Sequence, residues 1–116
     1  MIKLTCHCGN IELMLSKLPT EATKCNCSIC HRYGALWSYF PKSDVTITAH
    51  EQPAKGYLWG DREAEFMHCP ICGCITHYET TERCDSQFVA VNMSMADIDV
   101  IEELQIKLLD KADRKR

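Results

Sequence analysis

The 116-residue chain lacks several features that would place it in common functional classes. It has no apolar run that approaches the roughly 20 residues needed for a transmembrane helix. It also has no basic surplus, since 13 lysines and arginines stand against 16 aspartates and glutamates, for a net charge of −3. Proteins that wrap nucleic acid normally carry a clear basic excess. The sequence therefore predicts neither a membrane protein nor a nucleic-acid partner.

The N-terminal segment MIKLTCHCGN lacks the apolar stretch and the small-residue cleavage site of a secretory signal. It carries one lysine and then continues directly into cysteines and a polar turn. We therefore expect no export and predict a cytoplasmic protein. The length suits one domain, whose core would be thin without added cross-links.

What the chain has in abundance is cysteine, at nine of its 116 residues. The odd total, the missing signal and the close i, i+2 pairs, which cannot easily bridge to each other, all disfavour a secreted disulfide framework. Reduced thiolates that hold zinc are the better interpretation. Seven of the nine fall into three tight groups: Cys6 and Cys8; Cys25, Cys27 and Cys30; Cys69 and Cys72.

Short strand-like runs separated by turn residues dominate the chain and predict one mainly β domain over residues 1–110. The charged residues 111–116 are expected to form a disordered tail. Strands are expected at 1–5 and 10–17, paired as a hairpin, and at 21–27, 35–40, 45–48, 56–59, 64–68, 75–78, 88–93 and 106–109.

Two segments have helical signals. Residues 94–104 are the best helix candidate, because Ser94 can cap the helix together with Asp97 three residues later. Residues 28–33 are expected to form a turn or a short helix that ends at Gly34.

Four of the cysteines predict a closed metal site, because structural zinc takes four tetrahedral ligands. Cys6 and Cys8 are expected on a strand, where side chains two residues apart share a face. Cys69 and Cys72 belong to the turn CPICG, which proline shapes and glycine closes. Such a site would clamp the first ten residues to the third quarter of the chain and contribute on the order of 10 kcal/mol to folding.

Three cysteines then remain for a second zinc ion: Cys25, Cys27 and Cys30. The fourth position would be free for water or substrate. A zinc ion with three thiolates is a net −1 centre, which is better suited to keeping a bound thiol deprotonated than to making hydroxide. The alternative is that Cys74, Cys84 or a histidine closes this site too; otherwise these two cysteines are expected as packed or half-exposed thiols.

Other notable residues are assigned to the framework. His7, His31 and His68 each neighbour a cysteine and are expected to be solvated or hydrogen-bonded structural histidines and not metal ligands. Lys24 and Arg32 flank the three-cysteine motif and could meet a substrate carboxylate, although a solvated surface is the simpler expectation. Five aromatic residues are expected in the core: Trp37, Tyr39, Phe40, Tyr57 and Trp59.

The ordered motifs CHCGNIEL, CNCSICHRYGAL, CPICG and VNMSMADID resemble the glutathione-dependent formaldehyde-activating enzyme family, also called the family of centromere protein V and formaldehyde-activating domains. The resemblance runs from Cys6 to about Asp110. It implies a single zinc-stabilised, β-rich domain of the Mss-four-like class, with one short helix near the C-terminus. It also implies a structural zinc on Cys6, Cys8, Cys69 and Cys72 and a catalytic zinc on Cys25, Cys27 and Cys30.

The family's named activity joins formaldehyde to glutathione and gives S-(hydroxymethyl)glutathione. The resemblance thus implies a zinc-dependent carbon–sulfur lyase that acts on a small aldehyde and on glutathione or another thiol. The alternative is a non-catalytic, zinc-stabilised binding module for a protein partner. Zinc content separates the two, because two ions, one of them easily exchanged, favour the enzyme, whereas one inert ion favours the module.

Overall fold

A computed structural model describes residues 2–110, and the mainly β prediction is confirmed. The predicted tail, 111–116, lies outside the described residues. No helix within the described part is long and apolar enough to cross a membrane. In chain order the elements are β1 (Ile2–Thr5), β2 (Ile11–Leu15), β3 (Glu21–Cys25), α1 (Ser28–Tyr33), β4 (Trp37–Phe40), the 3₁₀ turn η1 (Lys42–Asp44), β5 (Val45–Ala49), β6 (Lys55–Leu58), β7 (Ala64–His68), β8 (Ile75–Thr80), β9 (Val89–Asn92), the 3₁₀ turn η2 (Met93–Met95), α2 (Ile98–Glu102) and β10 (Gln105–Leu109).

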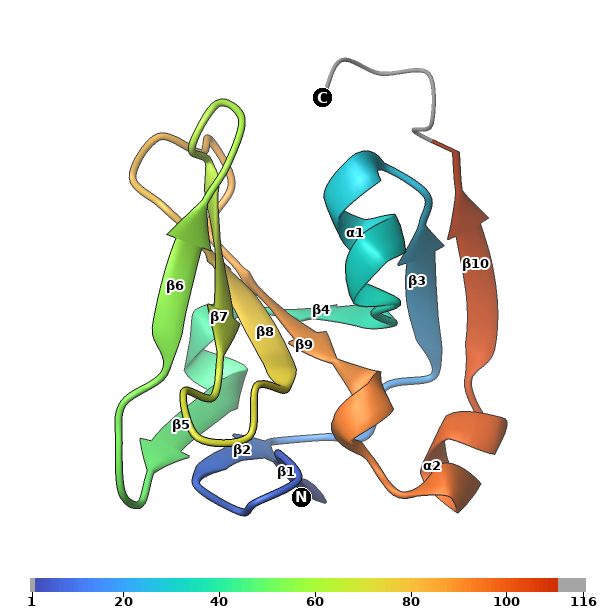
Figure 1. Cartoon of the computed structure of the whole chain (residues 1–116). Coiled ribbons are helices and arrows are strands. Elements are labelled where there is room, and N and C mark those ends of the chain that lie inside the picture. Colours follow the sequence, from blue (N-terminus) through green and yellow to red (C-terminus); the bar gives the residue numbers. More distant parts are fainter. Residues whose placement is uncertain (1, 111–116) are drawn as a thin grey trace.

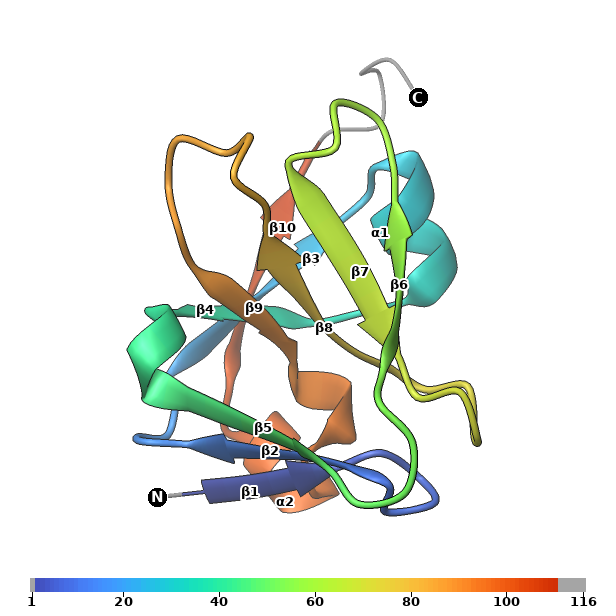
Figure 2. The same cartoon turned by 90° about the vertical axis from the view of Figure 1, so that its left-hand side faces the viewer.

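The strands form two sheets (Figure 1). The small sheet has the order β1-β2-β5, and the large sheet has the order β10-β3-β4-β9-β8-β7-β6. The expected N-terminal hairpin is present, with Leu4 opposite Leu13. The last strand, β10, runs parallel to β3, so the C-terminal end of the described chain returns to the strand that ends at Cys25. Figure 2 shows the small sheet lying below the large one.

The main core lies between the two sheets. Alternate residues of β2 are buried because successive strand side chains point to opposite faces. Leu13 and Leu15 pack in this way with Val91 and Met93 from the far side of the core. The core is therefore built from the alternate, inward-facing side chains of the two sheets.

The opposite face of the large sheet carries a second cluster, which includes two of the cysteines. Trp37 and Ala90 are buried there with Cys25 and Cys30, and α1 covers them with Ile29. Neighbouring residues of the same strands, such as those on either side of Ala90, face the main core instead. The large sheet thus separates the folding core from the face that holds the three-cysteine motif.

The helical predictions need correction. The segment expected to be one helix over 94–104 is instead the turn η2, an extended Ala96 and the five-residue α2. Ser94 does not cap a helix, because it lies within η2, where its amide donates to the side chain of Asn92 at 3.1 Å, and the N-cap residue of α2 is Asp97. Residues 28–33 form a true helix that ends at Gly34 with φ +63°. The described chain therefore has two short α-helices: α1, where a turn or a short helix was expected, and α2, which is shorter than expected.

Candidate metal centres

The first cysteine pair lies in the turn that joins β1 to β2. The prediction that Cys6 and Cys8 share a strand face is wrong, because β1 ends at Thr5 and the chain must reverse before Ile11. Within the turn, the Gly9 amide donates to the Cys6 carbonyl at 3.1 Å and the Ile11 amide donates to the Cys6 sulfur at 3.2 Å. A turn can also point both sulfurs in the same direction, so Cys6 and Cys8 can still act as a pair of metal ligands.

The second pair lies in a matching turn between β7 and β8. The Gly73 amide donates to the Cys69 carbonyl at 2.9 Å, and the Ile71 amide points at the Cys69 sulfur at 3.4 Å. Gly73 has φ +83°, close to the +84° of Gly9 in the first turn, and L side chains rarely adopt this conformation. Two turns of similar construction therefore face each other.

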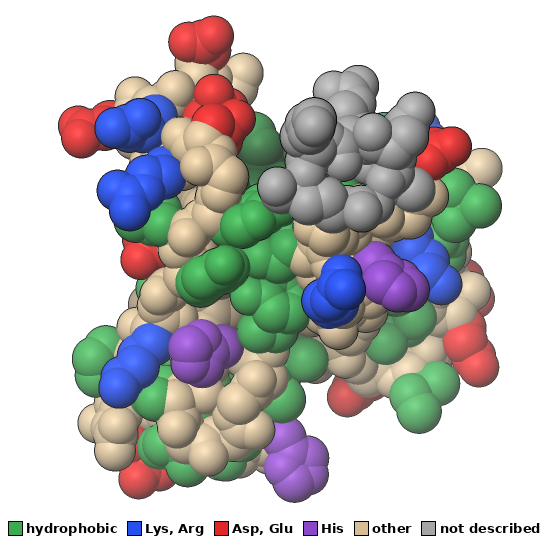
Figure 3. Space-filling model, turned by 45° about the horizontal axis from the view of Figure 1, so that its top comes forward, with side chains coloured by type: hydrophobic (Ala, Val, Ile, Leu, Met, Phe, Trp, Pro, Cys, Tyr) green, Lys and Arg blue, Asp and Glu red, His purple; other side chains and the backbone are tan. Residues whose placement is uncertain are grey.

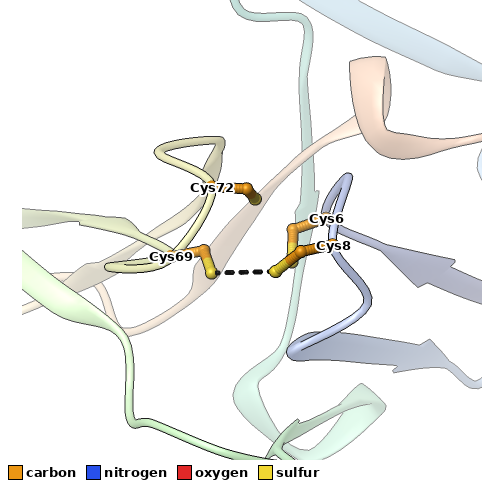
Figure 4. A group of neighbouring side chains, drawn as sticks. All are labelled: Cys6, Cys8, Cys69 and Cys72. Atoms are coloured by element: carbon orange, nitrogen blue, oxygen red, sulfur yellow. Dashed lines mark hydrogen bonds between the residues drawn. The ribbon is translucent and has the colours of Figure 1, made fainter.

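The four sulfurs of these turns converge (Figure 4). The Cys6–Cys8 and Cys8–Cys69 sulfur distances are both 3.7 Å, and all four sulfurs, including that of Cys72, lie within 4.8 Å of one another. A zinc–sulfur bond of about 2.3 Å gives a tetrahedral edge of about 3.8 Å. A disulfide needs about 2.05 Å, and all nine cysteines are free. The geometry fits a tetrahedral metal ion.

The pKa values of two of these thiols, Cys72 and Cys8, are shifted in opposite directions. Burial disfavours the Cys72 thiolate, but hydrogen bonds from the Cys74 and Cys8 amides lower its pKa to about 5. The backbone N–H of Asn10 favours the Cys8 thiolate, yet lost hydration and the bond with Cys69 raise the pKa of Cys8 to about 12. Neighbouring thiols cannot all ionise together without a positive charge between them.

One buried residue that the sequence did not single out braces this cluster. Asn10 is 1% exposed, and its amide nitrogen donates to the Gln52 carbonyl at 2.8 Å and to the Cys69 sulfur at 3.4 Å. Its side-chain oxygen accepts from the amides of Glu51 and Gln52 at 2.7 and 2.9 Å. Asn10 therefore fixes the second cysteine turn and the segment before β6 onto the first turn.

Replacing Asn10 with alanine should lower the free energy of unfolding by about 2–4 kcal/mol, because several buried partners lose their hydrogen bonds together. Urea denaturation of the zinc-loaded protein measures the change. Gln52→Ala is the matched control, since Gln52 contributes backbone groups to this network, and it should cost less than about 0.5 kcal/mol. An equal loss of unfolding free energy in Asn10→Ala and Gln52→Ala would contradict the proposed role of the Asn10 side chain.

The three-cysteine motif lies on the other face of the large sheet. Cys25 is the last residue of β3, Cys27 occupies the N-cap position of α1, and Cys30 lies within that helix. Their three sulfurs also lie within 4.8 Å of one another. Among residues 2–110, no fourth cysteine, histidine or carboxylate joins this group, and Cys74 and Cys84 belong to neither cluster.

The trio is held in a partly buried setting. Trp37, which is 1% exposed, donates its indole N–H to the Cys30 sulfur at 3.4 Å. Burial raises the pKa of Cys30. Burial opposes the Cys27 thiolate as well, but the amides of Cys30 and Ile29 donate to it, and its pKa is lowered. The N-cap position thus supplies a sulfur that carries charge more readily than its neighbours.

A hollow of about 280 Å³ opens beside the trio and is lined by both Cys25 and Cys30. Its lining also includes the charged residues Lys24 and Asp110, together with His31 and with Leu108 and Leu109 of β10. A ligand in this hollow would therefore have a lysine, a carboxylate and apolar residues around it.

The other residues singled out from the sequence divide between surface and core. His7, His31 and His68 join neither cysteine group. The core prediction holds for Trp37 and Phe40 and is wrong for Tyr39 and Tyr57, which are 47% and 50% exposed. Trp59 is half-buried, and Arg32 is exposed and donates to the Ser28 carbonyl at 2.9 Å.

Comparison with known proteins decides the family. The model of the glutathione-dependent formaldehyde-activating enzyme family matches residues 1–107. The chain belongs to this family. A search of curated proteins finds no match. Among solved structures, the chain is similar to a crystal structure of a Rhodobacter sphaeroides protein from a structural-genomics programme, with 27% identity, a TM-score of 0.73, and coverage of 91% of this chain and 100% of that one. The family resemblance noted in the sequence is thereby confirmed.

Proposed function

We propose that this member of the formaldehyde-activating family is a zinc-dependent carbon–sulfur lyase that joins a thiol to a small aldehyde. The observation that carries the proposal is the three-sulfur group, which has no fourth donor among the described residues and lies beside a hollow. A structural site is normally closed by four ligands, whereas a catalytic site keeps one position open. Cys25, Cys27 and Cys30 would hold the catalytic ion.

The four-sulfur cluster would hold a second, structural zinc ion through Cys6, Cys8, Cys69 and Cys72. Its sulfur spacing supports this assignment, and so does its position between two turns that are about 60 residues apart in sequence. Each turn takes its shape from local amide–sulfur and amide–carbonyl bonds. The metal would therefore join two preformed turns instead of shaping each one.

At the three-sulfur site, a bound zinc ion would supply a positive charge that keeps an added thiol deprotonated. The chain itself orients the reactants. The Trp37 indole fixes the Cys30 sulfur, so that the trio keeps its orientation. Lys24, in the lining of the hollow, would pair with a carboxylate of a glutathione-like thiol, and Leu108 and Leu109 of β10 would offer it apolar contacts.

Metal analysis combined with a turnover assay tests the proposal. We expect two zinc ions per chain, one of which a mild chelator removes while the fold is retained. Removal should abolish acceleration of hemithioacetal formation from formaldehyde and glutathione, measured by NMR exchange, and added zinc should restore it. The same assay with cysteine and 2-mercaptoethanol examines other thiols.

One inert zinc ion, together with no acceleration for any thiol, would contradict the enzyme and favour the binding module. Chelation that unfolds the chain in step with loss of the first ion would contradict the division into an open and a closed site. Circular dichroism recorded on the same samples separates these outcomes.

A further inference from the structure

A row of residues, mostly aromatic, crosses the large sheet on the face that carries the three-cysteine motif. Tyr57 of β6 lies opposite Phe66 of β7, which lies opposite Tyr78 of β8. Tyr78 lies opposite Ala90 of β9, and Ala90 lies opposite Tyr39 of β4. The Phe66 and Tyr78 rings are 5.0 Å apart. Residues that are directly opposite in a sheet share a face, so these side chains form one continuous strip.

Helix α1 and the end of β6 turn part of this strip into a cleft. A hollow of about 440 Å³ is lined by Ser28, Ile29, Arg32, Tyr33, Tyr57 and Trp59. The Tyr33 ring packs 5.7 Å from that of Phe66, which joins the helix side to the aromatic row. We call this hollow the aromatic cleft. Figure 3 shows hydrophobic side chains gathered at the centre of this face, between the side of β6 and β7 and the side of α1.

The aromatic cleft begins next to the three-cysteine site. Ser28 and Ile29 of its lining directly follow Cys27 in the chain, and Cys27 packs on the same buried cluster as Tyr33 and Trp59. Trp59 also lines a second hollow of about 380 Å³ that extends toward Tyr78. A ligand held at the open side of the trio therefore has an apolar surface within reach.

The hollows on the two sides of α1 have different linings. The hollow at Cys25 and Cys30 is lined by Lys24, His31 and Asp110, which can meet the charged groups of a peptide-like thiol, and by Leu108 and Leu109. The aromatic cleft presents rings, with Arg32 as the charged residue in its lining. Formaldehyde has two non-hydrogen atoms and cannot use such a surface, whereas an aromatic ring would bury against it.

We propose that the aldehyde used by this chain carries an aromatic group, which binds in the aromatic cleft while the thiol occupies the hollow beside Cys25. This inference rests on the proposed lyase function. In the reaction, the thiol sulfur bonds to the carbonyl carbon, the carbon–oxygen π bond breaks, and the thiol proton ends on that oxygen. The product is a hemithioacetal, and no oxidant or reductant is needed.

Binding of stable thioethers tests the ligand class separately from turnover. S-benzylglutathione and S-methylglutathione share the peptide and differ in the ring. By isothermal titration calorimetry, the zinc-loaded protein should bind the benzyl compound at least about tenfold more tightly. Tyr57→Ser and Trp59→Leu should each bring the ratio close to one. Leu58→Ser is the matched control, because Leu58 is 41% exposed, lies between these two residues and points to the other face of β6.

Equal affinity of the two compounds for the unaltered protein, or no binding of either, would overturn the proposal. A ratio that survives both cleft substitutions would overturn it as well. Thermal melting checks that each variant folds. If Trp59→Leu does not fold, the result for Tyr57→Ser decides the test, because Tyr57 lies on an exposed edge strand. A retained ratio without turnover of benzaldehyde or formaldehyde would instead refute the lyase function and leave the ligand class standing.

Discussion

Replacing Cys72 with serine should unfold the protein. The substitution removes one of four sulfurs from the cluster that joins the N-terminal hairpin to the turn between β7 and β8. Structural zinc sites contribute on the order of 10 kcal/mol, whereas the whole stability of a domain is about 5–15 kcal/mol. The thin core cannot compensate for such a loss. Far-ultraviolet circular dichroism and metal analysis of the purified variant provide the measurement.

Cys74→Ser is the matched control for Cys72→Ser. Cys74 lies two residues further along, is also half-buried, and belongs to neither metal cluster. Its replacement should change the free energy of unfolding by less than about 1 kcal/mol. A Cys72→Ser protein with the control's unfolding midpoint and full zinc content would show that the cluster does not hold the fold together.

Replacing Cys27 with serine should abolish activity and leave the fold intact, in contrast to the unfolding expected for Cys72→Ser. The variant should remain folded, lose one zinc ion of two, and retain less than about 1% of the hemithioacetal-forming activity, since even altered support of a metal ligand costs about 10–100-fold. The three-cysteine motif spans residues 25–30, so its metal ties no distant segments together. Zinc content, circular dichroism and the NMR exchange assay provide the three readouts.

Cys84→Ser serves as the control for Cys27→Ser, because it removes a half-buried thiol that lies outside both clusters. It should keep both ions and full activity. If Cys27→Ser unfolds the chain as severely as Cys72→Ser does, the motif is structural and the enzyme proposal fails. If it stays folded and fully active with one ion, the catalytic assignment of the trio fails.

The division of the cysteines can be predicted from the sequence because it depends on local spacing and on ligand count. Spacing sorts seven cysteines into groups of two, three and two, and the two pairs together supply the four ligands of a closed zinc site. The assignment of Cys6 and Cys8 to a strand failed because a two-residue spacing suits both a strand and a tight turn. The turn is favoured here because Thr5 must pair with Glu12 across the hairpin.

The remaining differences come from contacts that the sequence pattern does not reveal. Asn10 donates to the Cys69 sulfur, 59 residues away, and Trp37 to the Cys30 sulfur, seven residues away. The residues next to Asn10 and Trp37 in the sequence do not predict these contacts. Ser94 fits the sequence pattern of a helix cap, but in the structure it lies within η2, where its amide donates to the side chain of Asn92. Tyr57 resembles a core aromatic by alternation, but its strand forms the edge of the sheet, so its ring is half exposed.

The sequence separation of the sulfurs has a consequence for biosynthesis. Cys8 and Cys69 are 61 positions apart, so closing that loop in a disordered chain costs on the order of 4 kcal/mol of chain entropy. On the ribosome, residues 25–30 emerge long before residue 72, and their loop is short. Under the proposed two-site assignment, the nascent polypeptide would acquire the ion of the trio locally, whereas the four-sulfur site would form only after the distant turns have met. The meeting of these turns would then limit the completion of folding.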